Sequence, residues 1–272
     1  MSLSLIKKRT LGLVGVGALG VYILTLILFY VFHNRIIFQY TQLPPNYQFQ
    51  FSGPYQEYYI KTKKGIQLNG LLFQSPTPSK GLIFYTHGNA DNLQRWGNYS
   101  VDFTELGYDV FMYDYRGYGK SEGQPNPKNL YNDSDDVYNW MIDELNPSKV
   151  ILYGRSLGST VASHLATKVN ANTLILETPF AEFEDVVYWP IRPLLHLFPI
   201  NISLSNTKSL AKVNYPKFIF HGTDDWVVPL SSAEKLKPLL DQPDHFITIE
   251  GAGHKNISDF ELYHTRLKEI LK

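Results

Sequence analysis

The chain has 272 residues, with 25 basic and 25 acidic side chains and no cysteine. Its zero net charge argues against nucleic acid as a partner, because domains that bind nucleic acid carry an excess of Lys and Arg. The missing cysteines exclude disulfides, thiolate metal sites and a cysteine nucleophile. The length and apolar content suit one globular domain of ordinary size.

The N-terminal region contains a long apolar stretch. Residues 11–32 include no charged side chain and follow a basic run at residues 7–9. Such a stretch is long enough to cross a hydrocarbon layer of about 30 Å as a helix. We therefore predict a cytoplasmic N-terminal tail at 1–10 and a transmembrane helix at 11–33. A cleaved signal peptide is the alternative, although its apolar core is normally shorter and is followed by small residues.

Charges on either side of this stretch predict its orientation. The basic run precedes it, whereas Arg35 alone follows closely. The positive-inside rule then places the body of the chain on the exoplasmic or periplasmic side. Glycosylation sequons begin at Asn98, Asn132, Asn201 and Asn256. Because Asn256 is two residues from His254, a candidate site residue, a bacterial periplasm fits more easily than a eukaryotic lumen.

Residues 34–54 are rich in Tyr, Gln, Pro and Phe and have no helical pattern. We expect them to form a stalk on the membrane interface or on the domain surface, with the main domain at 55–272. Within that domain, residues 57–60 and 68–73 flank the turn residues Lys63, Lys64 and Gly65. This pattern predicts an antiparallel hairpin at the edge of a sheet.

Short apolar runs then alternate with amphipathic segments. Runs of this kind are typical of strands that are buried on both faces of a parallel sheet. In the segment 133–145, Val137, Met141 and Leu145 recur at a spacing of four residues, which predicts a crossover helix. We therefore predict an α/β fold with a mostly parallel central sheet and helices on both faces. The expected strands are residues 82–85, 110–113, 150–153, 173–176, 218–220 and 246–249.

The segment Gly154-Arg155-Ser156-Leu157-Gly158 directly follows one of these strands and precedes a helical segment. In that context the pattern G-x-S-x-G predicts a nucleophile elbow, whose glycines allow a tight strand-to-helix turn. The turn puts Ser156 at a helix N-terminus, where free N–H groups favour negative charge developing nearby. A glycine-rich turn capped by serine is the alternative for the motif taken alone.

Two later segments supply an acid and a base in the order Ser, Asp, His. The strand at 218–220 runs into a turn that carries Asp224 and Asp225. The strand at 246–249 runs into a loop of small residues that ends at His254. An imidazole changes charge near neutral pH, so it can take a serine proton while a carboxylate fixes its tautomer.

Besides the elbow, three further motifs stand after predicted strands: His87-Gly88-Asn89-Ala90, Asp114-Tyr115-Arg116-Gly117-Tyr118-Gly119-Lys120-Ser121 and, after the elbow, His221-Gly222-Thr223-Asp224-Asp225-Trp226-Val227-Val228-Pro229. In these four motifs and their order, the chain from about Tyr55 to its C-terminus resembles the α/β-hydrolase superfamily. With Glu177-Thr178-Pro179-Phe180 and a short insertion before the acid, it is most similar to single-pass membrane α/β-hydrolase domain proteins of the serine aminopeptidase-like group. The resemblance implies the α/β-hydrolase fold.

The resemblance also implies roles for single residues. In the pattern His-Gly-x-x-Asp-x-x-Val-Pro the acid aligns with Asp225, which leaves Asp224 as a turn residue. The backbone N–H groups of Asn89 and Leu157 are expected to form the oxyanion hole. Structural rather than catalytic roles are expected for His87, Asp114, Arg116 and His221. Glu177 and Glu250, each at a strand end, are weaker candidates for the acid.

Residues 180–213 lie where members of this superfamily insert a cap. They are rich in apolar side chains and carry few charges. We expect them to roof an apolar acyl pocket or to dip into a nearby bilayer, and the alternative is that they simply cover the sheet edge.

No cofactor, metal or nucleotide is expected. The eight histidines are scattered without H-E-x-x-H spacing. The pattern G-x-G-x-x-G at residues 15–20 lies inside the apolar stretch and has no strand before it. Gly119-Lys120-Ser121 imitates the end of a phosphate loop but lacks the required earlier glycine, because Asp114 stands there.

Three function classes follow. The leading one is a membrane-anchored serine hydrolase with Ser156 as nucleophile, Asp225 as orienting acid and His254 as base. We expect it to cleave ester or thioester bonds of a small-molecule or lipid-linked acyl substrate, with membrane lipid as its partner. The second is a serine aminopeptidase, in which Glu177 or Glu182 would hold the substrate's free amine. The third is a non-catalytic scaffold that retains the fold.

Overall fold

The computed structural model describes residues 3–187 and 203–272. They fall into an N-terminal helix and a globular unit that begins at Gln39. The central part of the predicted cap, residues 188–202, lies outside the described residues, as does the sequon at Asn201.

The N-terminal helix α1 spans Leu3–Ile37. It extends beyond both ends of the predicted span at 11–33, because neither residues 3–10 nor residues 34–37 contain a glycine or proline that would break it. The predicted tail at 1–10 is therefore largely helical. Within α1, the 24 residues Gly12–Arg35 are long and apolar enough to cross a membrane, and none of their most apolar window is buried. These properties suit a membrane anchor or a signal sequence.

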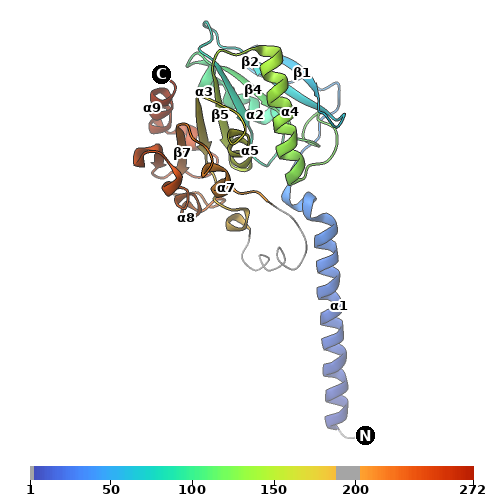
Figure 1. Ribbon diagram of the computed structural model, residues 1–272. Helices are drawn as coiled ribbons and strands as arrows, with labels where there is room; N and C mark the ends of the chain where they lie inside the picture. The colour runs from blue at the N-terminus through green and yellow to red at the C-terminus, as the bar shows by residue number, and fades with distance from the viewer. Residues whose placement is uncertain (1–2, 188–202) are drawn as a thin grey trace. The chain divides into compact units, whose positions relative to one another are not determined.

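The globular unit is built on one sheet, with the strand order β1-β2-β4-β3-β5-β6-β7-β8 among the described residues (Figure 1). β1 pairs with β2, and β2 with β4, in antiparallel fashion, and the remaining neighbours are parallel. The strands are β1 (Tyr55–Lys61), β2 (Gln67–Phe73), β3 (Leu82–Thr86), β4 (Asp109–Tyr113), β5 (Val150–Arg155), β6 (Thr173–Glu177), β7 (Lys217–Gly222) and β8 (Phe246–Ile249). The predicted hairpin and the predicted mostly parallel sheet are confirmed.

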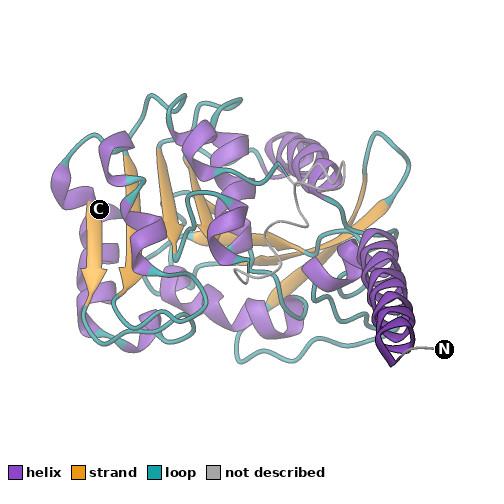
Figure 2. Cartoon of the chain, turned by 90° about the horizontal axis from the view of Figure 1, so that it is seen from below, coloured by secondary structure: helices purple, strands orange, loops and turns teal. Residues whose placement is uncertain are grey.

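Burial explains why the central strands read as continuous apolar runs. Every residue of β3, β5 and β6 is buried. Helices cover both faces of the sheet, as Figure 2 shows. On one face the ring of Tyr138 in α4 packs against Phe84 of β3, and on the other Phe103 of α3 packs against Tyr153 of β5.

The helices of the globular unit are mostly short. The longest is α4, which begins at Pro127 rather than at residue 133 as predicted, because the Asn126 side chain caps it by accepting from Asn129 N–H at 2.9 Å. The α-helices are α2 (Leu93–Trp96), α3 (Val101–Thr104), α4 (Pro127–Leu145), α5 (Leu157–Ala166), α7 (Asn206–Leu210), α8 (Leu230–Glu234) and α9 (Glu261–Ile270). Short 3-10 turns occur at Gly97–Ser100, Phe183–Val186, Lys237–Leu239, Pro243–His245 and Ile257–Asp259.

Residues 39–54, which the sequence predicts to be a stalk on the membrane interface or on the domain surface, lie in the same compact unit as the sheet. The N–H of Leu43 donates to the carbonyl of Gly119 at 2.8 Å. The rings of Phe51 and Phe73 meet edge to face at 5.0 Å, and Phe49 is only 5% exposed. Aromatic side chains in this segment therefore add to the core, although its irregular backbone gives no periodic signal in the sequence.

The strand order fixes where a site can form. β3 lies between β4 and β5, so the chain moves outward from β3 to β4 and then returns past β3 to β5. At such a switch point, the loops that leave the two neighbouring strands diverge and leave a crevice at the carboxyl edge of the sheet. The loops after β3 and β5 begin at His87 and Ser156.

We expect Phe49→Ala to lower the free energy of unfolding by roughly 3 to 5 kcal/mol, because it empties a buried aromatic site. Denaturant unfolding of the full-length chain in detergent micelles measures this change. The neighbouring exposed Gln48→Ala is the control, with an expected change within about 0.5 kcal/mol. An equally small effect of both substitutions would show that residues 39–54 form a stalk after all.

Candidate functional site

Ser156 occupies the sharp turn between β5 and α5. Its backbone has φ 52° and ψ −116°, a conformation that is rare for residues other than glycine. The Ser156 N–H donates to the carbonyl of Glu177 at 2.9 Å, which ties the turn to β6. A Cβ on Gly158 would lie 2.0 Å from the carbonyl oxygen of Thr86, and one on Gly154 would lie 2.6 Å from the carbonyl oxygen of Gly158. Both glycines of the motif are therefore required by close packing.

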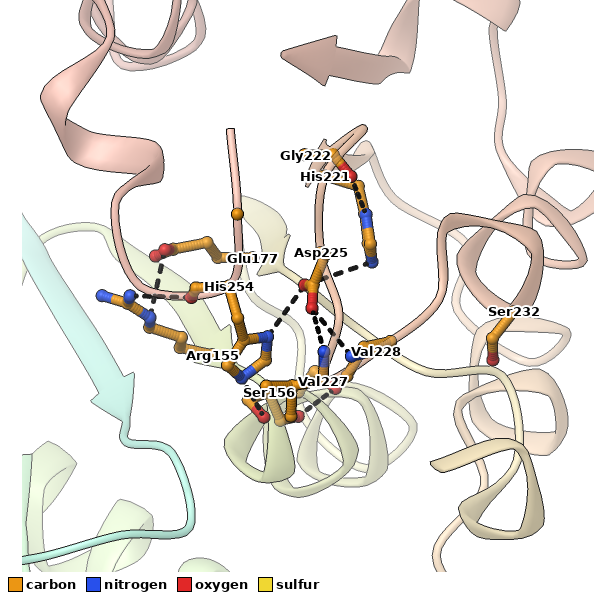
Figure 3. A network of polar contacts seen from close by, with 12 residues as sticks. Arg155, Ser156, Glu177, His221, Gly222, Asp225, Val227, Val228, Ser232 and His254 are labelled. Atoms are coloured by element: carbon orange, nitrogen blue, oxygen red, sulfur yellow. Dashed lines mark hydrogen bonds and ion pairs between the residues drawn. The ribbon is translucent and has the colours of Figure 1, made fainter. Parts of the chain in front are cut away.

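His254 and Asp225 reach this serine from the loops after β8 and β7 (Figure 3). His254 Nε2 lies 3.1 Å from Ser156 Oγ, and His254 Nδ1 lies 2.8 Å from Asp225 Oδ2. The three predicted side chains thus form one hydrogen-bonded row. Because an ionised carboxylate can only accept, Nδ1 carries the proton and Nε2 is free to accept from the serine hydroxyl.

Asp225 is held as an anion by its surroundings. Burial by itself opposes ionisation, but the hydrogen bond from His254 and those from backbone N–H groups outweigh it and lower the pKa of Asp225 below its usual value. The N–H groups of Val227 and Val228 donate to its Oδ1 at 2.9 and 2.8 Å. A negative charge at this position stabilises an imidazolium at His254.

The neighbouring Asp224 is placed quite differently. Its side chain is exposed, and its Oδ1 accepts from the hydroxyl of Thr223 at 3.1 Å. Its backbone N–H donates to the carbonyl of Ala252 at 2.9 Å. Of the two aspartates that the sequence places side by side, the structure brings Asp225 to the histidine and leaves Asp224 in the turn.

His87 and His221 are fully buried in the loops after β3 and β7. His221 Nδ1 donates to the carbonyl of Gly222 at 3.0 Å, and its Nε2 lies 3.8 Å from Asp225 Oδ2. Burial lowers the pKa of His221. His87 Nδ1 donates to the carbonyl of Gly88 at 2.7 Å, and burial lowers the pKa of His87 to about 4. Both rings are therefore neutral at neutral pH and shape the loops around the site.

Asp114 completes this buried layer. Its Oδ1 lies 3.5 Å from His87 Nε2, and its Oδ2 accepts from the N–H of Leu93 at 3.3 Å. Burial raises the pKa of Asp114 well above its usual value. Arg116, from the same loop, donates to the two carboxylate oxygens of Asp133 at 2.6 and 2.7 Å. Among the described residues, neither Asp114 nor Arg116 forms a hydrogen bond or ion pair with the side chains of the row Ser156–His254–Asp225.

The two residues expected to form an oxyanion hole, Asn89 and Leu157, come from two segments that pack together. Asn89 lies in the loop after β3, and Leu157 lies at the start of α5, whose Gly158 packs on β3. Leu157 is the first residue of α5, so its N–H belongs to the first helical turn. Asn89 follows β3, and its Oδ1 accepts from the hydroxyl of Tyr118 at 2.9 Å and from Gln39 N–H at 3.3 Å. The Asn89 side chain thus fixes its loop, and the oxyanion role stays a prediction about the two backbone N–H groups.

A buried ion pair below the serine was missed by the sequence reasoning. Arg155 Nε lies 3.1 Å from Glu177 Oε1, and both side chains are almost fully buried. Glu177, a candidate for the acid or for an amine-binding group, is therefore closed to substrate. Arg155 occupies a variable position of the G-x-S-x-G pattern, so nothing in the motif marks it. Glu250 is exposed, and among the described residues it forms no hydrogen bond or ion pair with Ser156, Asp225 or His254.

Solved structures share this fold. An esterase of Pyrococcus furiosus superposes with a TM-score of 0.67 at 19% sequence identity, over 86% of this chain and 97% of the other. An α/β serine hydrolase homologue from Coxiella burnetii superposes with a TM-score of 0.61 at 19% identity, over 82% of this chain and 98% of the other. At such identities the likeness shows the fold alone.

Sequence comparisons point the same way. A family model described as serine aminopeptidase, S33, matches residues 77–200. Alpha/beta hydrolase domain-containing protein 17B of Homo sapiens is 28% identical over 214 residues, or 78% of this chain and 73% of the relative. In sequence the chain is thus similar to α/β-hydrolases, and it shares their fold.

The chain is also similar to a bacterial protein. An uncharacterised protein of Mycobacterium tuberculosis is 28% identical over 202 residues, or 72% of this chain and 71% of the relative. The comparisons confirm the predicted α/β-hydrolase fold and the predicted resemblance to α/β-hydrolase domain proteins.

The buried neutral His87 makes the hydrolase less stable in acid. Histidine in the unfolded chain takes up a proton near pH 6.5, whereas folded His87 does so near pH 4. Between these values the unfolded chain binds more protons, so the free energy of unfolding falls as the pH drops, by on the order of 3 kcal/mol from this residue. His87→Asn should flatten the fall between pH 7 and pH 4, measured by denaturant unfolding.

The buried but non-titrating Ile83→Val is the control for this measurement. It should lower the free energy of unfolding by a similar amount at each pH. A full acid dependence in His87→Asn would mean that His87 is not the group responsible.

Proposed function

We propose that this hydrolase is a serine hydrolase with Ser156 as nucleophile, His254 as general base and Asp225 as orienting carboxylate. The observation that carries the proposal is the row Ser156–His254–Asp225, with contacts of 3.1 and 2.8 Å and the tautomer that base catalysis needs. The strained backbone at Ser156 supports it further, because such strain persists where a side chain must be displayed.

The reaction follows from this arrangement. Ser156 Oγ attacks the carbonyl carbon while its proton passes to His254 Nε2, and the carbonyl oxygen becomes an oxyanion that accepts from the N–H groups of Asn89 and Leu157. The tetrahedral adduct collapses, and the leaving group takes the proton from Nε2. Water then attacks the acyl-enzyme and gives a proton to Nε2. The second adduct collapses to the free acid, and Ser156 Oγ leaves with that proton from Nε2, which restores the starting state.

We further propose that the scissile bond is an ester or thioester of a lipophilic acyl substrate. Directly after Asp225 come Trp226 and Val227, which are 94% and 53% exposed. Two exposed apolar side chains next to a site residue favour contact with an apolar substrate or a lipid surface. The apolar helix α1 supports a membrane anchor, with its N-terminus cytoplasmic and the globular unit on the exoplasmic or periplasmic side.

A serine aminopeptidase is the second candidate, favoured by the description of the matching family model. An aminopeptidase needs an acidic group to hold the free amine of its substrate. Glu177 is paired with Arg155, and Glu182 accepts from the hydroxyl of Ser205 at 2.8 Å. Because both carboxylates have partners, ester or thioester cleavage remains our preferred reaction.

Labelling with a fluorophosphonate probe tests the nucleophile. We expect the full-length chain in detergent micelles to react, and Ser156→Ala to react not at all. Asp225→Asn should slow labelling by on the order of 10³-fold to 10⁴-fold, because the imidazole loses its tautomer and its counter-charge. The adjacent Asp224→Asn is the matched control and should remain within about threefold of wild type, since it lies outside the hydrogen-bonded row.

Equal losses in the two aspartate variants would overturn the assignment of the acid. A folded wild-type chain that never labels would favour the non-catalytic scaffold.

A series of acyl esters tests the substrate class. In lipid vesicles, we expect kcat/KM to rise from acetyl to medium and long acyl esters or thioesters, and free peptides to be poor substrates. Trp226→Ala should lower kcat/KM for long chains by about tenfold, the value of one lost apolar contact, and leave acetyl esters nearly unchanged. Leu262→Ala, at an exposed apolar residue of α9, is the control. Preference for free peptides would support the aminopeptidase instead.

A further inference from the structure

Arg155 is a buried cation next to the proposed active site. It precedes Ser156 in the chain and is 1% exposed. Its guanidinium lies over the rings of Tyr99 and Trp96, at 4.5 and 5.4 Å from their centres. Burial alone would lower the pKa of Arg155, but the charge of Glu177 outweighs it and raises that pKa. The side chain is therefore a permanent charge placed within the core.

Two groups of the site converge on this cation (Figure 3). Its Nε lies 3.1 Å from Glu177 Oε1, and its Nη2 donates to the main-chain carbonyl of His254 at 3.2 Å. The guanidinium thus spans from β6 to the loop that carries the proposed base.

Glu177 connects the same assembly to the nucleophile. Its main-chain carbonyl accepts from the N–H of Ser156 at 2.9 Å. Its second carboxylate oxygen accepts from the hydroxyl of Tyr153 at 2.6 Å, and that hydroxyl lies 3.0 Å from the hydroxyl of Tyr263. The main chain of Glu177 therefore holds the nucleophile, while its side chain holds the arginine that contacts His254.

Stability alone is a weak reason for such an arrangement. Bringing an ion pair into a protein interior has a large desolvation cost, and an apolar pair of similar volume is often as stable. The contacts suit positioning better. The imidazole of His254 is bonded to Asp225 at one end, and its main chain lies in a loop with glycines at 251 and 253. A second attachment, at the carbonyl, limits how far the ring can move from Ser156.

We propose that Arg155 is a positioning residue that holds the main chain of His254, and through it Nε2, at hydrogen-bonding distance from Ser156. This inference rests on the proposed function, because it assigns His254 as the base. Arginine suits the task since its planar fork presents several donors in fixed directions, so one side chain can bond Glu177 and the His254 carbonyl together. A lysine would keep the charge without that geometry.

The decisive experiment compares Arg155→Lys with wild type in the full-length chain. We expect kcat and the rate of fluorophosphonate labelling to fall by about 10-fold to 100-fold, because small displacements of a catalytic group have effects of that size. KM should change little. In proton NMR spectra, the downfield signal of the His254 Nδ1 proton should broaden or shift, because the ring is less firmly held.

Arg116→Lys is the matched control. Arg116 and Asp133 form another buried ion pair, at 2.6 Å, away from the proposed base. We expect this variant to lose a similar amount of stability in denaturant unfolding and to label at the wild-type rate. Glu177→Gln is the second test variant, should Arg155→Lys fail to fold. It keeps the size of the side chain, and its labelling rate should also fall.

Wild-type labelling rates in a folded Arg155→Lys or Glu177→Gln would overturn the inference and leave the ion pair a purely structural role. Failure of the proposed function gives a different result, since wild type itself would then not label. In that case the His254 proton signal still decides between the two roles of Arg155. An unchanged signal in Arg155→Lys would overturn the positioning role, and a broadened one would support it.

Discussion

The close contact between the first turn of α5 and the end of β3 sets the geometry of the whole site. At Gly158 the two backbones are so near that a Cβ would meet the Thr86 carbonyl oxygen at 2.0 Å. The Thr86 hydroxyl donates across the same contact, to the carbonyl of Gly158 at 2.8 Å. Because the elbow packs directly on β3, Ser156 and the loop that carries Asn89 lie close together at one edge of the sheet. Without this approach the hydroxyl and the expected oxyanion donors would have no common centre.

The groups around the site differ in charge, and their surroundings determine which of them are ionised. Buried histidines at 87 and 221 are kept neutral, since burial lowers their pKa, while backbone N–H groups and His254 keep Asp225 ionised. The cation next to Ser156 in the chain, Arg155, is balanced by the carboxylate of Glu177. Among the described residues, Asp225 is the carboxylate that pairs with the imidazole of His254, and such a pair holds the ring in one tautomer, as the proposed role of general base requires.

Much of the fold could be predicted because its signals are local. Strands such as β3 and β5 are buried on both faces and appear as unbroken apolar runs, and the elbow has its own pattern of glycines. Other features depend on contacts between distant segments. The packing of Phe49 on Phe51, Tyr55 and the core has no periodicity, and the bond from Arg155 to His254 joins positions 99 residues apart. Asp224 and Asp225 differ only in the direction that the turn gives their side chains, which local composition does not encode.

The positive φ of Ser156 has an evolutionary consequence. Glycine adopts such a backbone without penalty, whereas a side chain there costs of the order of 1 kcal/mol or more. Replacing this serine by glycine would therefore relax the turn, so the protein without the hydroxyl would be the more stable one. Selection for stability alone would remove the hydroxyl within a lineage. Serine is present at this strained position, so a function of its hydroxyl has outweighed the gain in stability that glycine would bring.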